Sequence, residues 1–193
     1  DYFRDLEDLL EAFTGFIRLL PERGTLIYCH DDAGALEAAE RARSLRADLR
    51  LLPYGLSAPG PYRLERPACG AGQTRFHLAG WPGELVLPLP GRHSALNAAA
   101  ALALVLEIME SEGRRIEEPE RRRMRASLAG FAGSRRRSEV IGQARGVLFI
   151  DDYGHHPTEI RATLEGLKAF YPGRRLVVDF MPHTYSRTLA LLS

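Results

Sequence analysis

The chain has 193 residues, with 26 basic and 25 acidic side chains and a formal net charge of +1. This length suits one large domain or one domain with part of a second, and such balanced charge gives no sign of a nucleic-acid or membrane-surface partner. Two cysteines, Cys29 and Cys69, are too few for a disulfide framework or a zinc site, which makes the reducing cytoplasm the expected location.

The N-terminal quarter of the sequence alternates helix and strand signals. The predicted elements are a helix over residues 3–20, a strand at Thr25–Cys29, a helix over 33–45 and a strand at Leu49–Tyr54. Asp31 and Asp32 precede the second helix and suit its N-terminal cap. A strand, helix and strand in this order predict a parallel pair joined by a right-handed crossover.

The middle of the chain has a different pattern of apolar and polar residues. Period-two alternation predicts short antiparallel strands at Tyr62–Leu64, Thr74–Leu78 and Leu85–Leu87. Helices follow over residues 94–111 and Pro119–Leu128. We expect no membrane span, because the longest apolar run ends at Glu107. The charged opening residues also differ from a secretory leader.

The C-terminal part returns to an α/β order. It predicts strands at Ser138–Gly142 and Gly146–Ile150, a helix at Pro157–Phe170, a buried strand at Leu176–Phe180 and a helix from Ser186 onward. This order is the opening half of a doubly wound unit. Too few strands are present at either end to close a sheet, so we expect two incomplete α/β domains. The small residues between Gly130 and Arg135 favour a boundary there, between 1–130 and 131–193.

The most informative segment is Asp151–Glu159, which reads DDYGHHPTE and follows the apolar run Val147–Ile150. Ligands of open α/β sheets bind where strands end and helices begin. Pro157 suits a first helical turn, and Glu159 suits the positive end of the helix dipole. The alternative is a solvated turn in which Asp152 only caps the helix, but so many polar side chains favour a functional site.

The basic residues are almost all arginine, because Lys168 is the single lysine. It lies in a helical context without a preceding glycine turn, so the chain contains no Walker-type phosphate loop. The run Arg135–Arg137 can be a solvated linker or a phosphate clamp, since guanidinium groups match pairs of phosphate oxygens.

Four motifs together resemble the Mur ligase family. They stand in the family's order and spacing and cover essentially the whole chain: Leu89–Ala98, Phe131–Glu139, Asp151–Glu159 and Pro182–Thr188. The resemblance implies that 1–130 is the rear part of the central ATP-binding domain, an ATPase-type α/β domain here without its phosphate loop. It also implies that 131–193 is the front part of the Rossmann-like C-terminal domain.

The resemblance also implies a nucleotide site. His93 and Asn97 match the residues that contact adenine, and their spacing of four places them on one helix face. Arg137 matches the arginine that contacts the ATP phosphates, and Asp152 matches the carboxylate that holds the ribose and the hinge. The family usually has asparagine where Ser94 stands and an aromatic residue where Ser138 stands.

The amino-acid side of the implied site involves Tyr153, His155, His183 and Arg187, with Arg187 pairing with the substrate carboxylate. The implied reaction adds L-alanine to UDP-N-acetylmuramate through an acyl phosphate, with ATP and Mg²⁺, in peptidoglycan synthesis. Arg137, Asp152 and His155 are the implied catalytic residues. The Mg²⁺ ligands and phosphate-loop lysine are expected outside this chain, which alone would be inactive.

Three alternatives stay open from the sequence. One is a recycling ligase of the same family that attaches a tripeptide to UDP-N-acetylmuramate. Another is a nucleotide-binding module without catalysis that retains His93, Asn97 and Asp152. The last is a metal site built from Asp151, Asp152, His155 and His156, although adjacent histidines at a helix start point apart.

Overall fold

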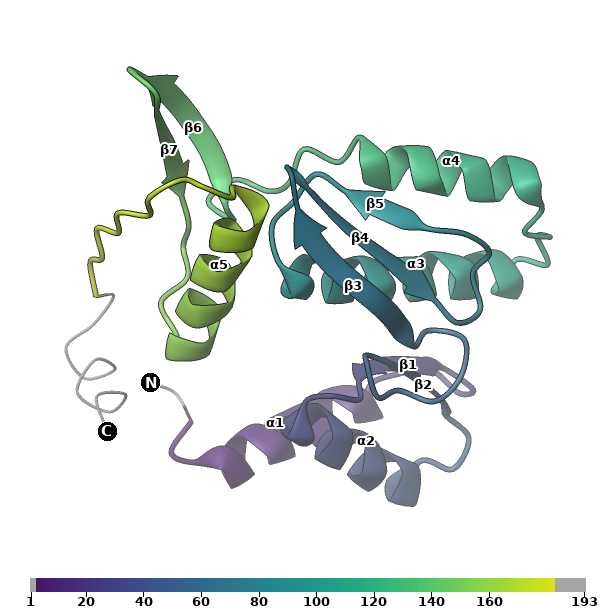
Figure 1. Cartoon of the computed structure of the whole chain (residues 1–193). Coiled ribbons are helices and arrows are strands. Elements are labelled where there is room, and N and C mark those ends of the chain that lie inside the picture. The colour runs from purple at the N-terminus through teal and green to yellow at the C-terminus, as the bar shows by residue number, and fades with distance from the viewer. Residues whose placement is uncertain (1–2, 183–193) are drawn as a thin grey trace. The chain divides into compact units, whose positions relative to one another are not determined.

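The computed structural model describes residues 3–182. This part of the chain forms helices and three small sheets, which confirms the predicted α/β class (Figure 1). The chain divides into two compact units, which we describe separately. The first comprises Asp1–Glu65, His77–Gly83 and Leu96–Glu117, and the second comprises Arg66–Phe76, Glu84–Ala95 and Glu118–Ser193.

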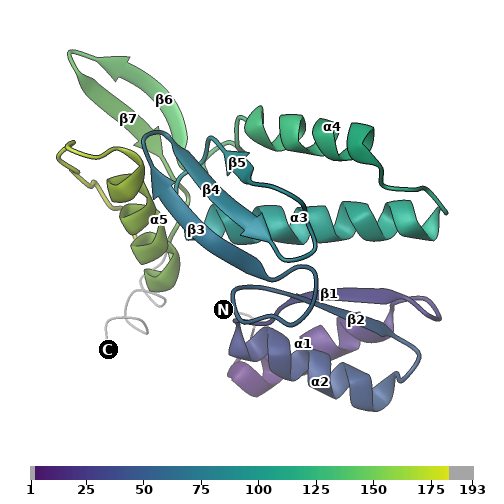
Figure 2. The ribbon, with the colours of Figure 1, turned by 45° about the vertical axis from the view of Figure 1, so that its right-hand side comes forward.

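A parallel strand pair covered by two helices opens the first unit. The elements are α1 (Leu6–Arg18), β1 (Thr25–Cys29), α2 (Ala33–Leu45) and β2 (Arg50–Tyr54). The two strands are parallel and in register along their whole length, as predicted. Both helices lie on one face of the pair (Figure 2). Their buried cluster consists of Leu10, Ile17, Ala38, Ala42 and Leu49.

The two aspartates after β1 have different roles. Asp32 is the N-cap of α2 and accepts a hydrogen bond from the Ala35 N–H at 2.7 Å. Asp31, which we had grouped with it as a cap, instead accepts from the backbone N–H groups of Leu56 and Ser57 and from the Ser57 hydroxyl. Asp31 therefore fixes the loop after β2.

The second sheet has the order β3-β4-β5 and is built from β3 (Leu64–Gly70), β4 (Gln73–Leu78) and β5 (Leu85–Leu87). β4 and β5 are antiparallel, as expected. The prediction for β3 was wrong in position, because the strand starts where we expected it to end. Pro67 interrupts the sequence pattern, and it is tolerated because β3 is an edge strand.

Two helices follow this sheet, α3 (Arg92–Ser111) and α4 (Glu118–Ala129), and α4 lies against β5. Among residues 3–182, α3 is the one helix that is long and apolar enough to cross a membrane by length and composition. This test alone does not identify a membrane span, and our expectation of none stays a prediction. The buried core helix of a soluble protein passes the same test.

The C-terminal part of the second unit is a hairpin followed by a helix. The strands are β6 (Glu139–Ala144) and β7 (Val147–Asp151), which pair antiparallel with an irregularity between Val140 and Gly142. Arg145 and Gly146 both have positive φ, as a tight two-residue hairpin turn requires. α5 (Pro157–Phe170) has the predicted bounds.

The segment Leu176–Phe180 does not form the buried strand that we predicted. Its backbone has no strand pairing with any described residue, and its side chains are exposed, with Val177 at 77%. An apolar run becomes a strand only when a neighbouring strand pairs with it, and β7 pairs with β6 alone within residues 3–182. The helix predicted from Ser186 lies outside the described residues.

Candidate functional site

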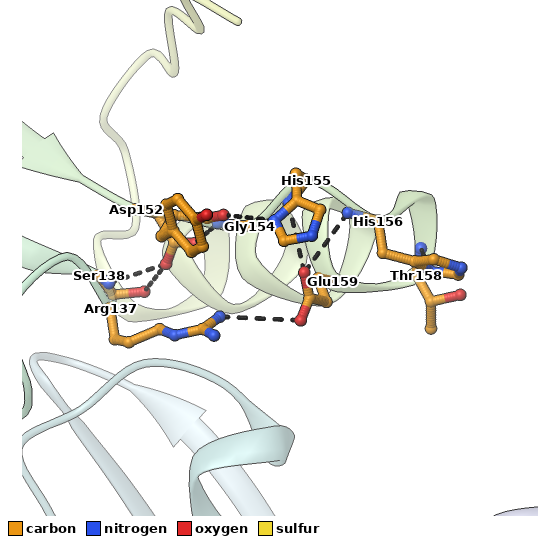
Figure 3. Close-up of polar contacts among 9 residues, drawn as sticks. Arg137, Ser138, Asp152, Gly154, His155, His156, Thr158 and Glu159 are labelled. Carbon is orange, nitrogen blue, oxygen red and sulfur yellow. Dashed lines mark hydrogen bonds and ion pairs between the residues drawn. The ribbon is translucent and has the colours of Figure 1, made fainter. Parts of the chain in front are cut away.

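The polar run after β7 forms a tight turn into α5 (Figure 3). His156 is the N-cap of the helix, and its Nδ1 accepts from the Thr158 N–H at 3.3 Å. Glu159 accepts in return from the His156 N–H at 3.4 Å, so the two residues form a capping box. Pro157 occupies the first turn, as expected. The helix start is therefore capped without Asp152.

Asp152 instead ties together neighbouring segments of the second unit (Figure 3). Its Oδ2 accepts from the Ser138 N–H at 2.8 Å and from the Ser138 hydroxyl at 3.2 Å. Its Oδ1 accepts from the Gly154 N–H at 2.7 Å. The carboxylate thus joins the segment before β6 to the turn after β7.

The basic run before β6 packs against the same strand end. The Tyr153 N–H donates to the Arg136 carbonyl at 2.8 Å, and the Arg136 N–H donates to the Glu139 carboxylate at 2.7 Å. The Arg136 guanidinium lies 4.9 Å from the centre of the Tyr153 ring, a cation–π distance. Its Nε is 3.4 Å from Asp151 Oδ2. Arg136 is therefore tied to the end of β7, although its side chain stays largely exposed.

Arg137 points toward the start of α5. Its Nη1 lies 3.8 Å from Glu159 Oε1, and both side chains remain partly exposed. Burial raises the pKa of Glu159, but hydrogen bonds from the His155 and His156 N–H groups and the charge of Arg137 outweigh it and hold this pKa below its ordinary value. Glu159 is thus an anion that faces Arg137 at neutral pH.

His93 lies in the first turn of α3, and its Nδ1 is buried without a hydrogen-bond partner among the described residues. Burial lowers the pKa of His93, the charge of Asp152 opposes this shift, and the charge of Arg137 adds to it. Asp152 and Arg137 therefore both lie within electrostatic reach of His93 in the second unit. A neutral imidazole with an unused ring nitrogen can exchange a hydrogen bond with a ligand.

A close backbone approach holds the loop before His93. Gly91 has φ +88°, and a Cβ on Gly166 of α5 would lie 2.8 Å from the Gly91 Cα. The Cys69 sulfur accepts from the Gly91 N–H at 3.3 Å and donates to the Gly166 carbonyl at 3.6 Å. The Ser94 hydroxyl donates to the Pro90 carbonyl at 2.7 Å. These contacts fix the segment that leads into α3.

The remaining predicted site residues lie in different parts of the chain, and two of them are outside the described residues. Asn97 lies one turn further along α3, in the first unit, and is exposed. The rings of Tyr153 and His155 meet edge to face at 5.2 Å, and His155 Nδ1 lies 3.0 Å from the Tyr153 carbonyl oxygen. His183 and Arg187 lie outside the described residues.

The alternative metal site is not formed in the part of the chain that the structure describes. There, no three His, Cys, Asp or Glu side chains come together in a group that could hold a metal ion. The four residues proposed for it have other contacts: Asp151 faces Arg136, Asp152 accepts from Ser138, His155 Nδ1 lies beside the Tyr153 carbonyl, and His156 caps α5.

A hollow of about 770 Å³ lies beside this turn, also within the second unit. Strand β7, the inner face of α5 and the extended segment 174–180 line it, and its rim includes Asp151, Asp152 and Gly154. The sequence did not predict it, because the lining segment Leu176–Phe180 was expected to be a buried strand.

Two contributors to the site were missed from the sequence. Ser138 donates twice to Asp152, but a serine next to arginines carries no signal for this. Glu159 was assigned to the helix dipole alone, although its position three residues after the cap is the sequence signature of a capping box.

Comparisons with known proteins identify the family. Residues 1–105 match the family described as Mur ligase middle domain, and residues 136–185 match the one described as Mur ligase, glutamate ligase domain. The chain is 48% identical over 193 residues to a UDP-N-acetylmuramate–L-alanine ligase of Treponema pallidum, covering all of this chain and 40% of that protein. The enzyme of that name from Paenarthrobacter aurescens is 39% identical over 97% of this chain and 39% of its own length.

Solved structures agree with this assignment. A UDP-N-acetylmuramate–alanine ligase from Thermotoga maritima matches 92% of this chain and 46% of its own, with a TM-score of 0.62 and 25% identity. Folylpolyglutamate synthetase from Lactobacillus casei matches 98% of this chain and 46% of its own with a TM-score of 0.71, and at 16% identity it shows the fold alone. The chain spans about 40% of the length of the curated relatives it matches. It belongs to the Mur ligase family.

Proposed function

We propose that the protein containing this chain is an ATP-dependent ligase that adds L-alanine to UDP-N-acetylmuramate in peptidoglycan synthesis. The observation that carries the proposal is the 48% identity, over the whole chain, to a relative with that name. We also propose that it acts in the cytoplasm, where ATP is available.

The proposed reaction has two steps. A carboxylate oxygen of the muramyl group attacks the γ-phosphorus of ATP, which forms an acyl phosphate and releases ADP. The amine of L-alanine then attacks the acyl carbon, loses a proton and displaces inorganic phosphate to leave an amide. Because the leaving groups are already good, the protein contributes mainly by positioning the reactants and neutralising phosphate charge.

We propose a nucleotide role for four residues. His93 and Asn97 contact the adenine, Asp152 accepts ribose hydroxyl hydrogens, and Arg137 contacts the phosphates. The influence of the Asp152 and Arg137 charges on His93 supports this assignment, because one bound nucleotide can reach all three. Arg137 can change partner, since its present contact with Glu159 is long and half exposed.

The amino-acid pocket is proposed to contain Tyr153, His155, His183 and Arg187. Arg187 would bind the carboxylate of L-alanine and leave its amine free to attack. His155 and Tyr153 pack edge to face, so their positions are coupled. Arg137, Asp152 and His155 are the proposed catalytic residues.

The phosphate-loop lysine and the Mg²⁺ ligands are proposed to lie outside this chain. Among residues 3–182, no group of three or more His, Cys, Asp or Glu side chains that could hold a metal ion is found. Mg²⁺ would neutralise the ATP phosphates when bound. We further propose that 1–130 belongs to the central ATP-binding domain and 131–193 to the C-terminal Rossmann-like domain.

The test uses the full-length protein and measures phosphate release. We expect release only when ATP, UDP-N-acetylmuramate and L-alanine are all present, and none from the isolated 193-residue chain. Replacing L-alanine by the muramyl tripeptide distinguishes the recycling ligase, because activity with the tripeptide alone would support that alternative. ATP binding without any ligase activity would support a non-catalytic module instead.

A further inference from the structure

The Asp152 carboxylate is already largely occupied within the protein. Each carboxylate oxygen can accept about two hydrogen bonds. Oδ2 accepts two from Ser138, through its N–H at 2.8 Å and its hydroxyl at 3.2 Å. Oδ1 accepts one, from the Gly154 N–H at 2.7 Å. One acceptor position therefore stays open, on Oδ1, whereas a ribose diol has two hydroxyl donors.

The two donors of Ser138 are not equally fixed. The backbone N–H belongs to a segment held on both sides, because the Arg136 carbonyl before it accepts from the Tyr153 N–H and Glu139 after it pairs with Asp151 in the β6–β7 hairpin. The hydroxyl makes the longer contact and can rotate about the Cα–Cβ bond. It is the donor that a ligand can displace.

We propose that the Ser138 hydroxyl competes with the nucleotide ribose for Asp152 and so sets nucleotide affinity and ribose selectivity. This inference rests on the proposed ATP-binding role of Asp152. Without nucleotide, the hydroxyl fills the second position on Oδ2. When a ribose binds, either its second hydroxyl stays unpaired with Asp152 or the serine hydroxyl rotates away.

The backbone conformation at Ser138 is specific to this position. Ser138 has φ +50°, an uncommon conformation for a residue other than glycine. Its surroundings impose this conformation, which keeps the N–H directed at Asp152 Oδ2 while the side-chain hydroxyl can still rotate.

The test measures binding of ATP, 2′-deoxy-ATP and 3′-deoxy-ATP to the full-length protein by titration calorimetry. Ser138→Ala removes the competing donor, so we expect about twofold to tenfold tighter ATP binding. We also expect a larger penalty for at least one deoxy analogue, because both ribose hydroxyls can then reach Asp152. A purely structural role for Ser138 would leave the ratio between ATP and its analogues unchanged.

Ser134→Ala is the matched control, because it removes an exposed hydroxyl four positions earlier that has no contact with Asp152, and we expect it to bind like the parent protein. If Ser138→Ala does not fold, Ser138→Gly carries the test, since glycine accepts a positive φ without strain. Equal affinities and ratios for the parent and the Ser138 variant would overturn the proposal. No ATP binding by the parent protein would instead reject the proposed function.

Discussion

Arg137 and Glu159 face each other across the turn between β7 and α5, with 3.8 Å between Nη1 and Oε1 (Figure 3). The same carboxylate accepts hydrogen bonds from the backbone of His155 and His156. The start of α5 is thereby linked to the proposed phosphate-binding arginine. A phosphate group that takes Arg137 away would leave Glu159 with its backbone donors, so the helix cap can remain while the arginine moves.

Glu159→Gln tests this link through stability. Glutamine can keep the capping box but not the charge, so we expect a loss of less than about 1 kcal/mol at pH 7. Because the pKa of Glu159 is lowered in the folded state, its contribution is present above its ordinary pKa and lost as pH falls below about 4. Urea unfolding at pH 7 and pH 3.5 should show a difference between parent and variant that shrinks at the lower pH. An equal difference in unfolding free energy at pH 7 and pH 3.5 would contradict a lowered pKa of Glu159 in the folded state.

Two helical glycines predict opposite effects of the same substitution. A Cβ on Gly166 would lie 2.8 Å from the Gly91 Cα, and backbone cannot move aside cheaply, so Gly166→Ala should destabilise by about 1–3 kcal/mol. Gly15 in α1 has no atom near its Cβ position, so Gly15→Ala should stabilise by about 0.5–1 kcal/mol. Thermal unfolding midpoints measure both. A tolerated Gly166→Ala would mean that α5 does not approach the loop as closely as described.

Local sequence signals were sufficient for most elements. The bounds of β1, α2 and α5 follow from apolar spacing, Asp32 as a cap and Pro157 at a helix start, all of which act within one or two turns. The wrong prediction of a strand at Leu176–Phe180 has a non-local cause. Its apolar side chains indicate a buried strand, but strand formation depends on a partner elsewhere in the chain.

The candidate residues were proposed from the sequence, whereas their contacts come from the structure. The motifs and the family resemblance indicated His93, Arg137 and Asp152, and the structure brings Arg137 and Asp152 within electrostatic reach of His93. The double hydrogen bond from Ser138 to Asp152 could not be predicted, because it requires a positive φ at a non-glycine residue. The approach of Gly91 to Gly166 likewise joins segments far apart in sequence.

We predict that the pKa of His93 shifts in opposite directions in two variants. Burial holds the pKa of His93 below its ordinary value of about 6.5, with Asp152 raising and Arg137 lowering it. Asp152→Asn should therefore lower this pKa further, and Arg137→Gln should raise it, as followed by histidine NMR signals. Because the unfolded chain binds the proton more readily, stability contributed by neutral His93 is present above about pH 6.5 and lost below it. Shifts of the same sign in both variants would refute the proximity of the three groups.

The contact between Tyr62 and Glu107 predicts that the first unit loses stability at alkaline pH. The Tyr62 hydroxyl donates to Glu107 Oε1 at 3.3 Å, and Glu107 is buried and paired with Arg50 at 2.8 Å. Burial, together with the charge of Glu107, raises the pKa of Tyr62 to about 12. Since the folded pKa lies above the ordinary value of about 10, this contribution is fully present below pH 10 and lost as pH rises toward 12.

Tyr62→Phe removes both the hydrogen bond and this titration. At pH 8 we expect the variant to be less stable by about 0.5–1.5 kcal/mol, because Glu107 loses a neutral donor but keeps Arg50. Between pH 10 and 12 the unfolding free energy of the parent should fall toward that of the variant, as measured by urea unfolding at several pH values. Parallel curves for the two proteins over this range would show that the phenol titrates alike in the folded and unfolded chains, and that Glu107 does not influence it.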